Sequence, residues 1–194
     1  MPNPWDNGGV KLLVAALESE LSAFPRSLDG FDRLVTGPGK LQATHALTRA
    51  LHDTAYEEVL VVGTAGAVDR ETTGVHEVTA AIQHDVSDID GIAGQHVSLP
   101  AQVSTGGTGG AIIATGDHFV DDAATVAAIR ALGGTLVDME TYAYIWVAAQ
   151  FGVRIRVLKA VSDNAQDDAI TDWRAAVAAC SVQLRDRVRE LYGV

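Results

Sequence analysis

The sequence has one cysteine and few positively charged residues. Because Cys180 is the only cysteine among 194 residues, no disulfide can form within the chain, which fits a reducing compartment. Cys180 lies in the nonpolar run AAVAACSV, so we interpret it as a packed helix residue and not as a nucleophile. Lysine and arginine total 14 against 25 aspartates and glutamates, a formal net charge of -11. This acidic balance argues against a general affinity for nucleic acid or for anionic membranes.

Long hydrophobic runs are also missing. No nonpolar stretch approaches the roughly 20 residues that span a bilayer, so no membrane partner is expected. The first residues, MPNPWDNGG, do not show the basic and then nonpolar pattern of a signal peptide. The sequence therefore predicts a cytoplasmic protein. With 47% hydrophobic and 20% charged residues, it predicts a globular chain, with a flexible tail over residues 1–9 and a single domain over residues 10–194.

Segments with the patterns of strands and of helices alternate along most of the chain. The predicted strands cover residues 10–17, 31–37, 57–68, 74–85, 111–120 (a strand with its exit), 135–139 and 154–161, and the predicted helices cover 40–54, 121–134, 140–152 and 170–192. We expect a loop over residues 86–110, which contain the glycine-rich run STGGTGG. This alternation predicts a three-layer α/β/α fold around a central mixed, mostly parallel sheet.

Polar or glycine-rich motifs follow several of these strands. Open α/β sheets bind ligands outside the carboxyl ends of their strands, so motifs at those ends together favour a pocket. Each motif also has a purely structural interpretation, such as a tight turn, a helix cap or a core position. The glycine spacing matches neither a phosphate-binding loop nor a dinucleotide fingerprint, and the histidines lack metal-ligand spacing, so no cofactor and no metal are expected. The motifs are GTAGA (63–67), TGDHFV (115–120), VDME (137–140) and VSDN (161–164).

These motifs resemble those of the nucleoside phosphorylase/nucleosidase superfamily, and most closely its 5'-methylthioadenosine/S-adenosylhomocysteine nucleosidase branch. The resemblance extends over nearly the whole chain in the same order. It implies the fold described above and an enzyme that hydrolyses the N-glycosidic bond of a small purine nucleoside, with a homodimer as the assembly. The matching motifs are TGPGK for Gly-x-Gly-Lys, GTAGAV for Gly-Ser-Ala-Gly, QHD for Tyr-His-Asp, TGDHF for Ser-Gly-Asp-x-Phe, VDME for Val-Glu-Met-Glu and KAVSDNA for Arg-Ala-Ile-Ser-Asp-x-Ala.

By the same resemblance, Asp163 is the general acid toward the purine N7 and Ser162 orients it. Glu140 would accept the ribose 2'- and 3'-hydroxyls and stabilise the positive charge that builds on the sugar. The remaining contacts implied are Met139 under the ribose, Phe119 stacked on the base, Val120 bonding the base through its backbone, and Thr64 in place of the family's serine near the sugar.

The sequence departs from the family at the acidic motif that follows the first strand. In AALESEL, Ser19 stands where the family has the glutamate that positions the attacking water. Glu18 and Glu20 flank it, and two residues on a helix are separated by about 200°, so they cannot share a face. We favour Glu20, with Glu18 as the alternative. Elsewhere, Lys159 replaces an arginine, and residues 86–110 form a shorter segment than the family has.

Two other functions remain open from the sequence. The first is phosphorolysis by a purine nucleoside phosphorylase. Related phosphorylases hold phosphate with an arginine at the position of Val61, and a valine cannot supply charge-assisted hydrogen bonds. The second is a catalytically inactive nucleoside-binding protein, which Ser19 favours and which the intact Asp163 and Glu140 argue against.

Overall fold

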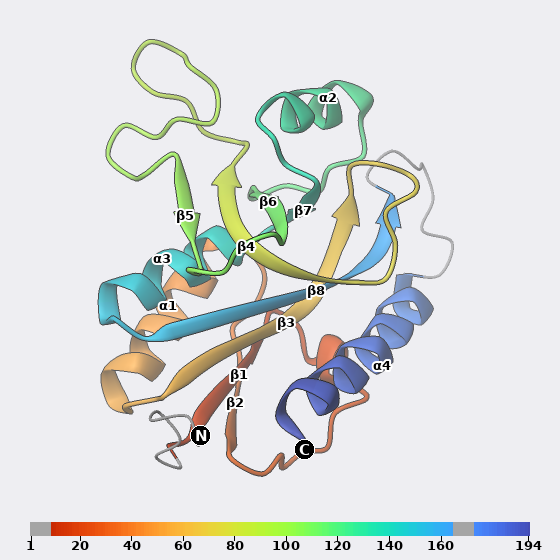
Figure 1. Cartoon of the computed structure of the whole chain (residues 1–194). Helices are drawn as coiled ribbons and strands as arrows, with labels where there is room; N and C mark the ends of the chain where they lie inside the picture. Colours follow the sequence, from red (N-terminus) through yellow and green to blue (C-terminus); the bar gives the residue numbers. More distant parts are fainter. Residues whose placement is uncertain (1–8, 165–172) are drawn as a thin grey trace.

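The computed structural model describes residues 9–164 and 173–194, and all structural statements refer to them (Figure 1). The strands are β1 (Lys11–Ala15), β2 (Phe31–Val35), β3 (Glu58–Ala67), β4 (Val75–Gln83), β5 (Gln102–Ser104), β6 (Ala111–Thr115), β7 (Leu136–Asp138) and β8 (Arg154–Asn164). The helices are α1 (Lys40–Asp53), α2 (Ala123–Ala131), α3 (Thr141–Phe151) and α4 (Trp173–Tyr192), with a short 3-10 helix, η1 (Glu18–Leu21).

The strands form one mixed sheet whose order is β2-β1-β3-β7-β6-β4-β5. Most neighbouring pairs are parallel, whereas β3–β7, β4–β5 and β4–β8 are antiparallel. Strand β8 pairs with both β3 and β4, so β3, β7, β6, β4 and β8 close into a ring. The mixed, mostly parallel sheet that the sequence predicts is therefore confirmed, and the ring is an addition to it.

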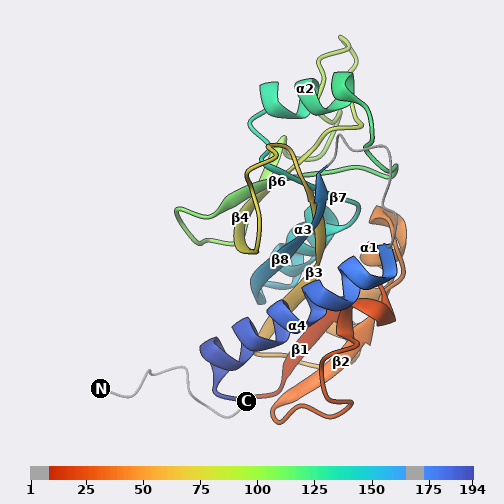
Figure 2. The same ribbon diagram turned by 90° about the vertical axis from the view of Figure 1, so that its right-hand side faces the viewer.

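Side chains that alternate along the strands build a core on each face of the sheet. In β3, Val59 and Val61 pack with α1 and α3 on one face, while Leu60 and Val62 pack with α4 on the other. Successive residues of a strand point to opposite faces, so a strand that is apolar throughout must be covered on both sides. Figure 2 shows α4 lying across one side of the sheet. The predicted three-layer arrangement is confirmed.

The observed elements differ from the predicted ones in a few places. GTAGA (63–67) is the last part of β3 and not a turn after it, because it pairs with β8 on one side and β7 on the other. The predicted loop 86–110 contains the short strand β5, which pairs with β4. Most of the predicted tail 1–9, and the first three residues of the predicted helix 170–192, lie outside the described residues. No helix in the described ranges has the length and apolar character that a membrane span requires.

Candidate active site

One pocket collects the motifs that follow the predicted strands. The pocket is open to solvent. Segments that are distant in sequence meet there. They are the residues that follow β1, β6 and β7 and the C-terminal parts of β3 and β8. The lining residues are Ala16, Leu17, Glu20, Pro38, Thr64, Ala65, Gly66, His118, Phe119, Val120, Val137, Asp138, Met139, Glu140, Ser162 and Asp163.

An irregularity in β8 places Ser162 and Asp163 at this pocket. The pairing of β8 with β3 runs in register as far as Ala65 opposite Val161, and resumes with Gly66 opposite Asp163. Ser162 is the extra residue of this β-bulge, and bulges re-aim side chains where a ladder is interrupted. The Ser162 hydroxyl donates a hydrogen bond to Asp163 Oδ2 at 2.7 Å. Ser162 and Asp163 both lie within β8, and the Ser162 hydroxyl fixes one oxygen of the Asp163 carboxyl.

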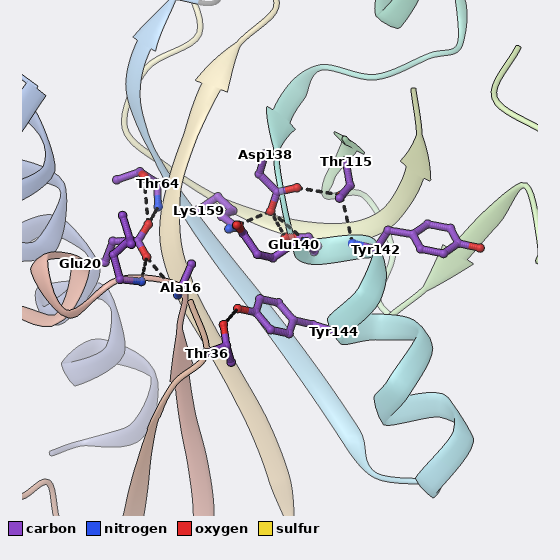
Figure 3. A network of polar contacts seen from close by, with 12 residues as sticks. Ala16, Glu20, Thr36, Thr64, Thr115, Asp138, Glu140, Tyr142, Tyr144 and Lys159 are labelled. Atoms are coloured by element: carbon purple, nitrogen blue, oxygen red, sulfur yellow. Dashed lines mark hydrogen bonds and ion pairs between the residues drawn. The ribbon is translucent and has the colours of Figure 1, made fainter. Parts of the chain in front are cut away.

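Glu20 reaches the pocket from η1 and is almost completely buried, with 3% of its surface exposed. Its Oε2 accepts hydrogen bonds from the backbone N–H groups of Ala16 and Leu17, and its Oε1 accepts from the N–H and the hydroxyl of Thr64 (Figure 3). These contacts hold the carboxylate between the end of β1 and the middle of β3. Thr64, the substitute for the family's serine, therefore contacts Glu20 directly.

Glu18 is not brought to the pocket. Its side chain is 76% exposed and forms a surface ion pair with Arg33 at 2.8 Å. Ser19 is exposed as well. Because η1 is a single turn, the three consecutive residues point in different directions, and only Glu20 faces the interior. Of the two acids that the sequence leaves open, the geometry favours Glu20.

Glu140 lies at the position just before α3, where a carboxylate often caps the helix. Its side chain forms no such cap. Instead Oε1 accepts the backbone N–H of Gly39, the residue just before α1, at 2.8 Å. Gly39 adopts φ +93°, which a residue with a side chain rarely does, so the glycine of TGPGK is required for this contact. The interpretation of Glu140 as a simple helix cap is wrong.

A buried ion pair, which was not among the site residues predicted from the sequence, lies next to these carboxylates. The Lys159 Nζ is 2.9 Å from Asp138 Oδ2, and each side chain is only 2% exposed. Asp138 also accepts hydrogen bonds from the Thr115 hydroxyl and from the N–H and hydroxyl of Thr141 (Figure 3). The signal was present, because Asp138 and Lys159 are charged residues inside the apolar strands TLVDM and VLKAV.

Lys159 also faces Glu20 across Gly63. A Cβ on Gly63 would lie 3.0 Å from Glu20 Oε1 and 3.1 Å from Lys159 Nζ, so only a glycine leaves room for both groups. Burial opposes the charge on Lys159, but the carboxylates of Asp138, Glu140 and Glu20 outweigh it and raise its pKa. One ammonium group thus stays charged among the carboxylates.

Burial, and next the negative charge of Asp138, raise the pKa of Glu140 to about 7 from an ordinary 4.5. Lys159 and the Gly39 N–H act in the opposite direction and do not fully compensate. Glu140 thus changes charge near neutral pH, unlike an exposed glutamate. Such perturbed groups in a pocket are typical of functional sites.

Replacing Glu140 by glutamine is expected to stabilise the folded protein at pH 8. Since the folded pKa of about 7 exceeds the ordinary 4.5, stability contributed by the neutral carboxyl is lost as the pH rises through this range. Glutamine keeps an oxygen for the Gly39 N–H and removes the buried charge. We expect a gain of about 1–3 kcal/mol in the free energy of unfolding at pH 8 that shrinks toward pH 5.

Urea denaturation of both proteins at pH 5.5 and 8 measures this difference. Glu190→Gln is the matched control, because Glu190 forms an exposed ion pair on α4. The control should show little gain at either pH. A gain for Glu140→Gln that is equal at both pH values would contradict the assignment of the raised pKa to Glu140.

The apolar side of the pocket is formed by the exits of β6 and β7. Phe119 is 57% exposed at the pocket, which leaves a ring face free for a flat ligand. Val120 beside it is buried, and Met139 is partly buried next to Glu140. His118, which the sequence analysis did not select, also lines the pocket and lies edge-on to His84, with ring centroids 5.1 Å apart. Within the described residues, no three His, Cys, Asp or Glu side chains are grouped as metal ligands.

The closed mixed sheet and the carboxylates that converge on its pocket define an α/β protein of the nucleoside phosphorylase type. The chain belongs to the phosphorylase superfamily, whose sequence profile matches residues 76–191. It is 32% identical over 157 residues to the 5'-methylthioadenosine/S-adenosylhomocysteine nucleosidase of Marinomonas sp. (strain MWYL1), covering 68% of this chain and 67% of that protein. It is 30% identical over 172 residues to the nucleosidase of the same name from Shewanella frigidimarina (strain NCIMB 400), covering 76% and 75%.

Solved structures share the fold at lower sequence identity. The native futalosine hydrolase of Helicobacter pylori strain 26695 superposes with a TM-score of 0.85 at 19% identity, over 95% of this chain and 97% of that one. The 5'-methylthioadenosine/S-adenosylhomocysteine nucleosidase of Neisseria meningitidis, in complex with methylthio-immucillin-A, gives 0.83 at 22%, over 94% and 98%. The resemblance that the sequence motifs indicate is confirmed.

Proposed function

We propose that this protein is a purine nucleosidase, an N-glycosyl hydrolase that splits a nucleoside related to 5'-methylthioadenosine or S-adenosylhomocysteine into free base and sugar. The observation that carries the proposal is the meeting of three carboxyl groups, on Glu20, Glu140 and Asp163, in one pocket with an exposed aromatic ring. Hydrolysis of an N-glycosidic bond needs an acid that protonates the departing purine, a group that binds and stabilises the sugar, and a group that holds the attacking water. The relatives named above carry this activity in their names.

Asp163 is the group we assign to the leaving base. A purine leaves poorly as an anion, and a proton on N7 allows it to leave as a neutral molecule when the C1'–N9 bond breaks and its electron pair passes to the ring. The hydrogen bond from the Ser162 hydroxyl to Oδ2 keeps the other oxygen available for N7. Phe119 would stack on the base, and Val120 would bond its edge through the backbone.

Glu20 is the group we assign to the water. As the base departs, water forms a bond to the anomeric carbon from the opposite face, and its proton must be accepted. Glu20 is the carboxylate that reaches the pocket from η1, beside Thr64 on β3. Lys159 Nζ lies on the other side of Gly63 from Glu20 Oε1, so its positive charge acts on the Glu20 carboxylate without a direct contact.

Glu140 is the group we assign to the ribose. With Oε1 occupied by the Gly39 N–H, Oε2 is left for the 2'- and 3'-hydroxyls. A carboxylate at this place also stabilises the positive charge that develops on the ring as the bond breaks. Met139, the neighbouring residue in the pocket, would pack under the sugar.

The pocket favours water over phosphate as the attacking group. None of the described lining residues is an arginine or a lysine, and the buried Lys159 is paired with Asp138. Val61, at the position of the phosphorylase arginine, is completely buried in the core and does not line the pocket. A phosphate dianion would enter a pocket lined by carboxylates without a charge-assisted donor.

An inactive nucleoside-binding protein is also disfavoured. Ser19 in place of the family's glutamate favours it, but Glu20 brings a carboxylate to the pocket from the next position. A pure binding site needs no group that protonates the base or accepts a proton from water, whereas carboxyl groups with perturbed pKa values in a pocket are typical of catalysis.

The activity is tested by incubating the pure protein with 5'-methylthioadenosine, S-adenosylhomocysteine, adenosine, inosine and futalosine, each with and without phosphate. We expect release of free base at a rate that phosphate does not change, with free sugar as the second product. Chromatography separates free sugar from sugar 1-phosphate. Production of sugar 1-phosphate would establish phosphorolysis, and no release from any nucleoside would reject an enzymatic role.

The assembly and the compartment are part of the same proposal. The family resemblance implies a homodimer, and large apolar side chains exposed on the described surface, such as Leu41 and Ile89, offer contacts for a second copy. Light scattering coupled to size-exclusion chromatography tests the dimer.

The single cysteine, which is buried, fits the reducing conditions of the cytoplasm.

A further inference from the structure

Helix α3 holds the turn 36–39 at both ends. At one end, Glu140 accepts the N–H of Gly39 at 2.8 Å. At the other end, the Tyr144 hydroxyl lies 2.6 Å from the Thr36 hydroxyl (Figure 3). Glu140 and Tyr144 are four residues apart, and the Tyr144 N–H bonds the Glu140 carbonyl, so they lie on one side of the first turn of α3. The turn between them carries Pro38 into the pocket.

The direction of these hydrogen bonds can be assigned. The Thr36 hydroxyl donates to the Gly37 carbonyl at 2.9 Å, so its oxygen accepts the proton of Tyr144. Burial raises the pKa of Tyr144 well above its ordinary value, which keeps the phenol protonated as a donor. The backbone N–H groups of Thr36 and Gly37 bond the end of β1. Tyr144 is therefore the side chain of α3 that anchors the start of the turn.

We infer that Tyr144 is a positioning residue for Glu140: it anchors the turn 36–39 so that the Gly39 N–H stays directed at the Glu140 carboxylate. The inference rests on the proposed function only for its effect on turnover. Gly37 and Gly39 both have positive φ, which residues with side chains rarely adopt, so the shape of the turn depends on the backbone bonds to the end of β1 and on the contact with Tyr144. Neither Tyr144 nor Thr36 lines the pocket, so any effect they have on the site must act through the turn.

A looser turn would weaken the hydrogen bond from Gly39 to Glu140. This bond stabilises the ionised carboxylate, so its weakening raises the pKa of Glu140 further. The other charged groups around Glu140 are Asp138 on β7, Lys159 on β8 and Glu20 on η1, and none of them is altered by a change at Tyr144. Lys40, the charged residue next to Gly39 at the start of α1, pairs with Asp85 and is not among the main groups that shift the pKa of Glu140.

Tyr144→Phe and Thr36→Val remove the two hydroxyls in turn, and carbon-13 NMR of the labelled glutamate side chains follows the titration of Glu140 in the free protein. Glu140→Gln identifies the signal. We expect both variants to raise the midpoint by about half a pH unit, a threefold change in proton affinity. The double variant should add little to Thr36→Val, because that change already removes the Tyr144 contact together with the bond from Thr36 to the Gly37 carbonyl.

Tyr142→Phe is the matched control. It removes a phenolic hydroxyl from the same helix, but this hydroxyl donates to the Pro100 carbonyl and does not contact the turn. We expect no change in the Glu140 titration. If Tyr144 served packing alone, thermal stability would fall and the titration midpoint would stay at its wild-type value, which would overturn the inference. An equal shift in Tyr142→Phe would overturn it as well.

Turnover gives a separate readout. If the wild type releases base, kcat/KM in Tyr144→Phe should fall by about threefold to tenfold, the size expected of one hydrogen bond. The acid limb of its pH profile should move to higher pH, because Glu140 must be ionised. If the wild type releases no base, the proposed function fails, and the NMR titration still decides the role of Tyr144.

Discussion

Asp163→Asn is expected to lower the rate of base release by roughly 10²–10⁴-fold, the range for loss of a general acid. Asparagine has the same shape and keeps an oxygen for the Ser162 hydroxyl, which donates to Asp163 at 2.7 Å. It cannot deliver a proton to N7. Affinity for free adenine should therefore change much less than turnover. Chromatography of released base and calorimetric titration of adenine measure the two effects.

Asp186→Asn is the control for this prediction, because Asp186 forms an exposed ion pair on α4. The control should turn over substrate at the wild-type rate. Circular dichroism and thermal unfolding establish that Asp163→Asn is folded. Near-normal turnover of a purine nucleoside by the folded variant would remove Asp163 from the mechanism.

Glu20→Gln is expected to lower turnover to a similar extent, about 10²-fold or more, while Glu18→Gln leaves it unchanged. Glutamine cannot accept a proton from water. Its amide nitrogen would also face N–H donors now bonded to the Glu20 carboxylate, so a loss of stability of about 1–3 kcal/mol accompanies the change. Glu18 forms only a surface pair with Arg33, so its change should affect neither property.

Assays are run at a temperature where both variants are fully folded, so that instability does not mimic catalysis. Loss in Glu20→Gln alone supports the assignment. Loss in Glu18→Gln alone would transfer the role to the exposed acid and would require η1 to rearrange. Full activity in both variants would mean that neither carboxylate positions the water.

The sequence by itself determined the elements and the motifs of the site. The β3 stretch is apolar at every position from 59 to 62, which requires cover on both faces, and the observed core has α1 and α3 on one side and α4 on the other. The motifs at the carboxyl ends of the strands contribute residues to one pocket, as predicted from strand direction. These properties depend on local composition and periodicity, so they are readable without knowing which strands pair.

Only the tertiary structure decided which side chains face the pocket and with what partners. The bulge at Ser162 arises from the register between β3 and β8, and the ring closes because β8 pairs with both β3 and β4. Register is a long-range property, and a shift of one residue would turn every side chain to the other face. The choice of Glu20, the Asp138–Lys159 pair and the anchoring of Thr36 by Tyr144 each join residues from distant segments. Such contacts follow from packing in three dimensions, which local sequence patterns do not encode.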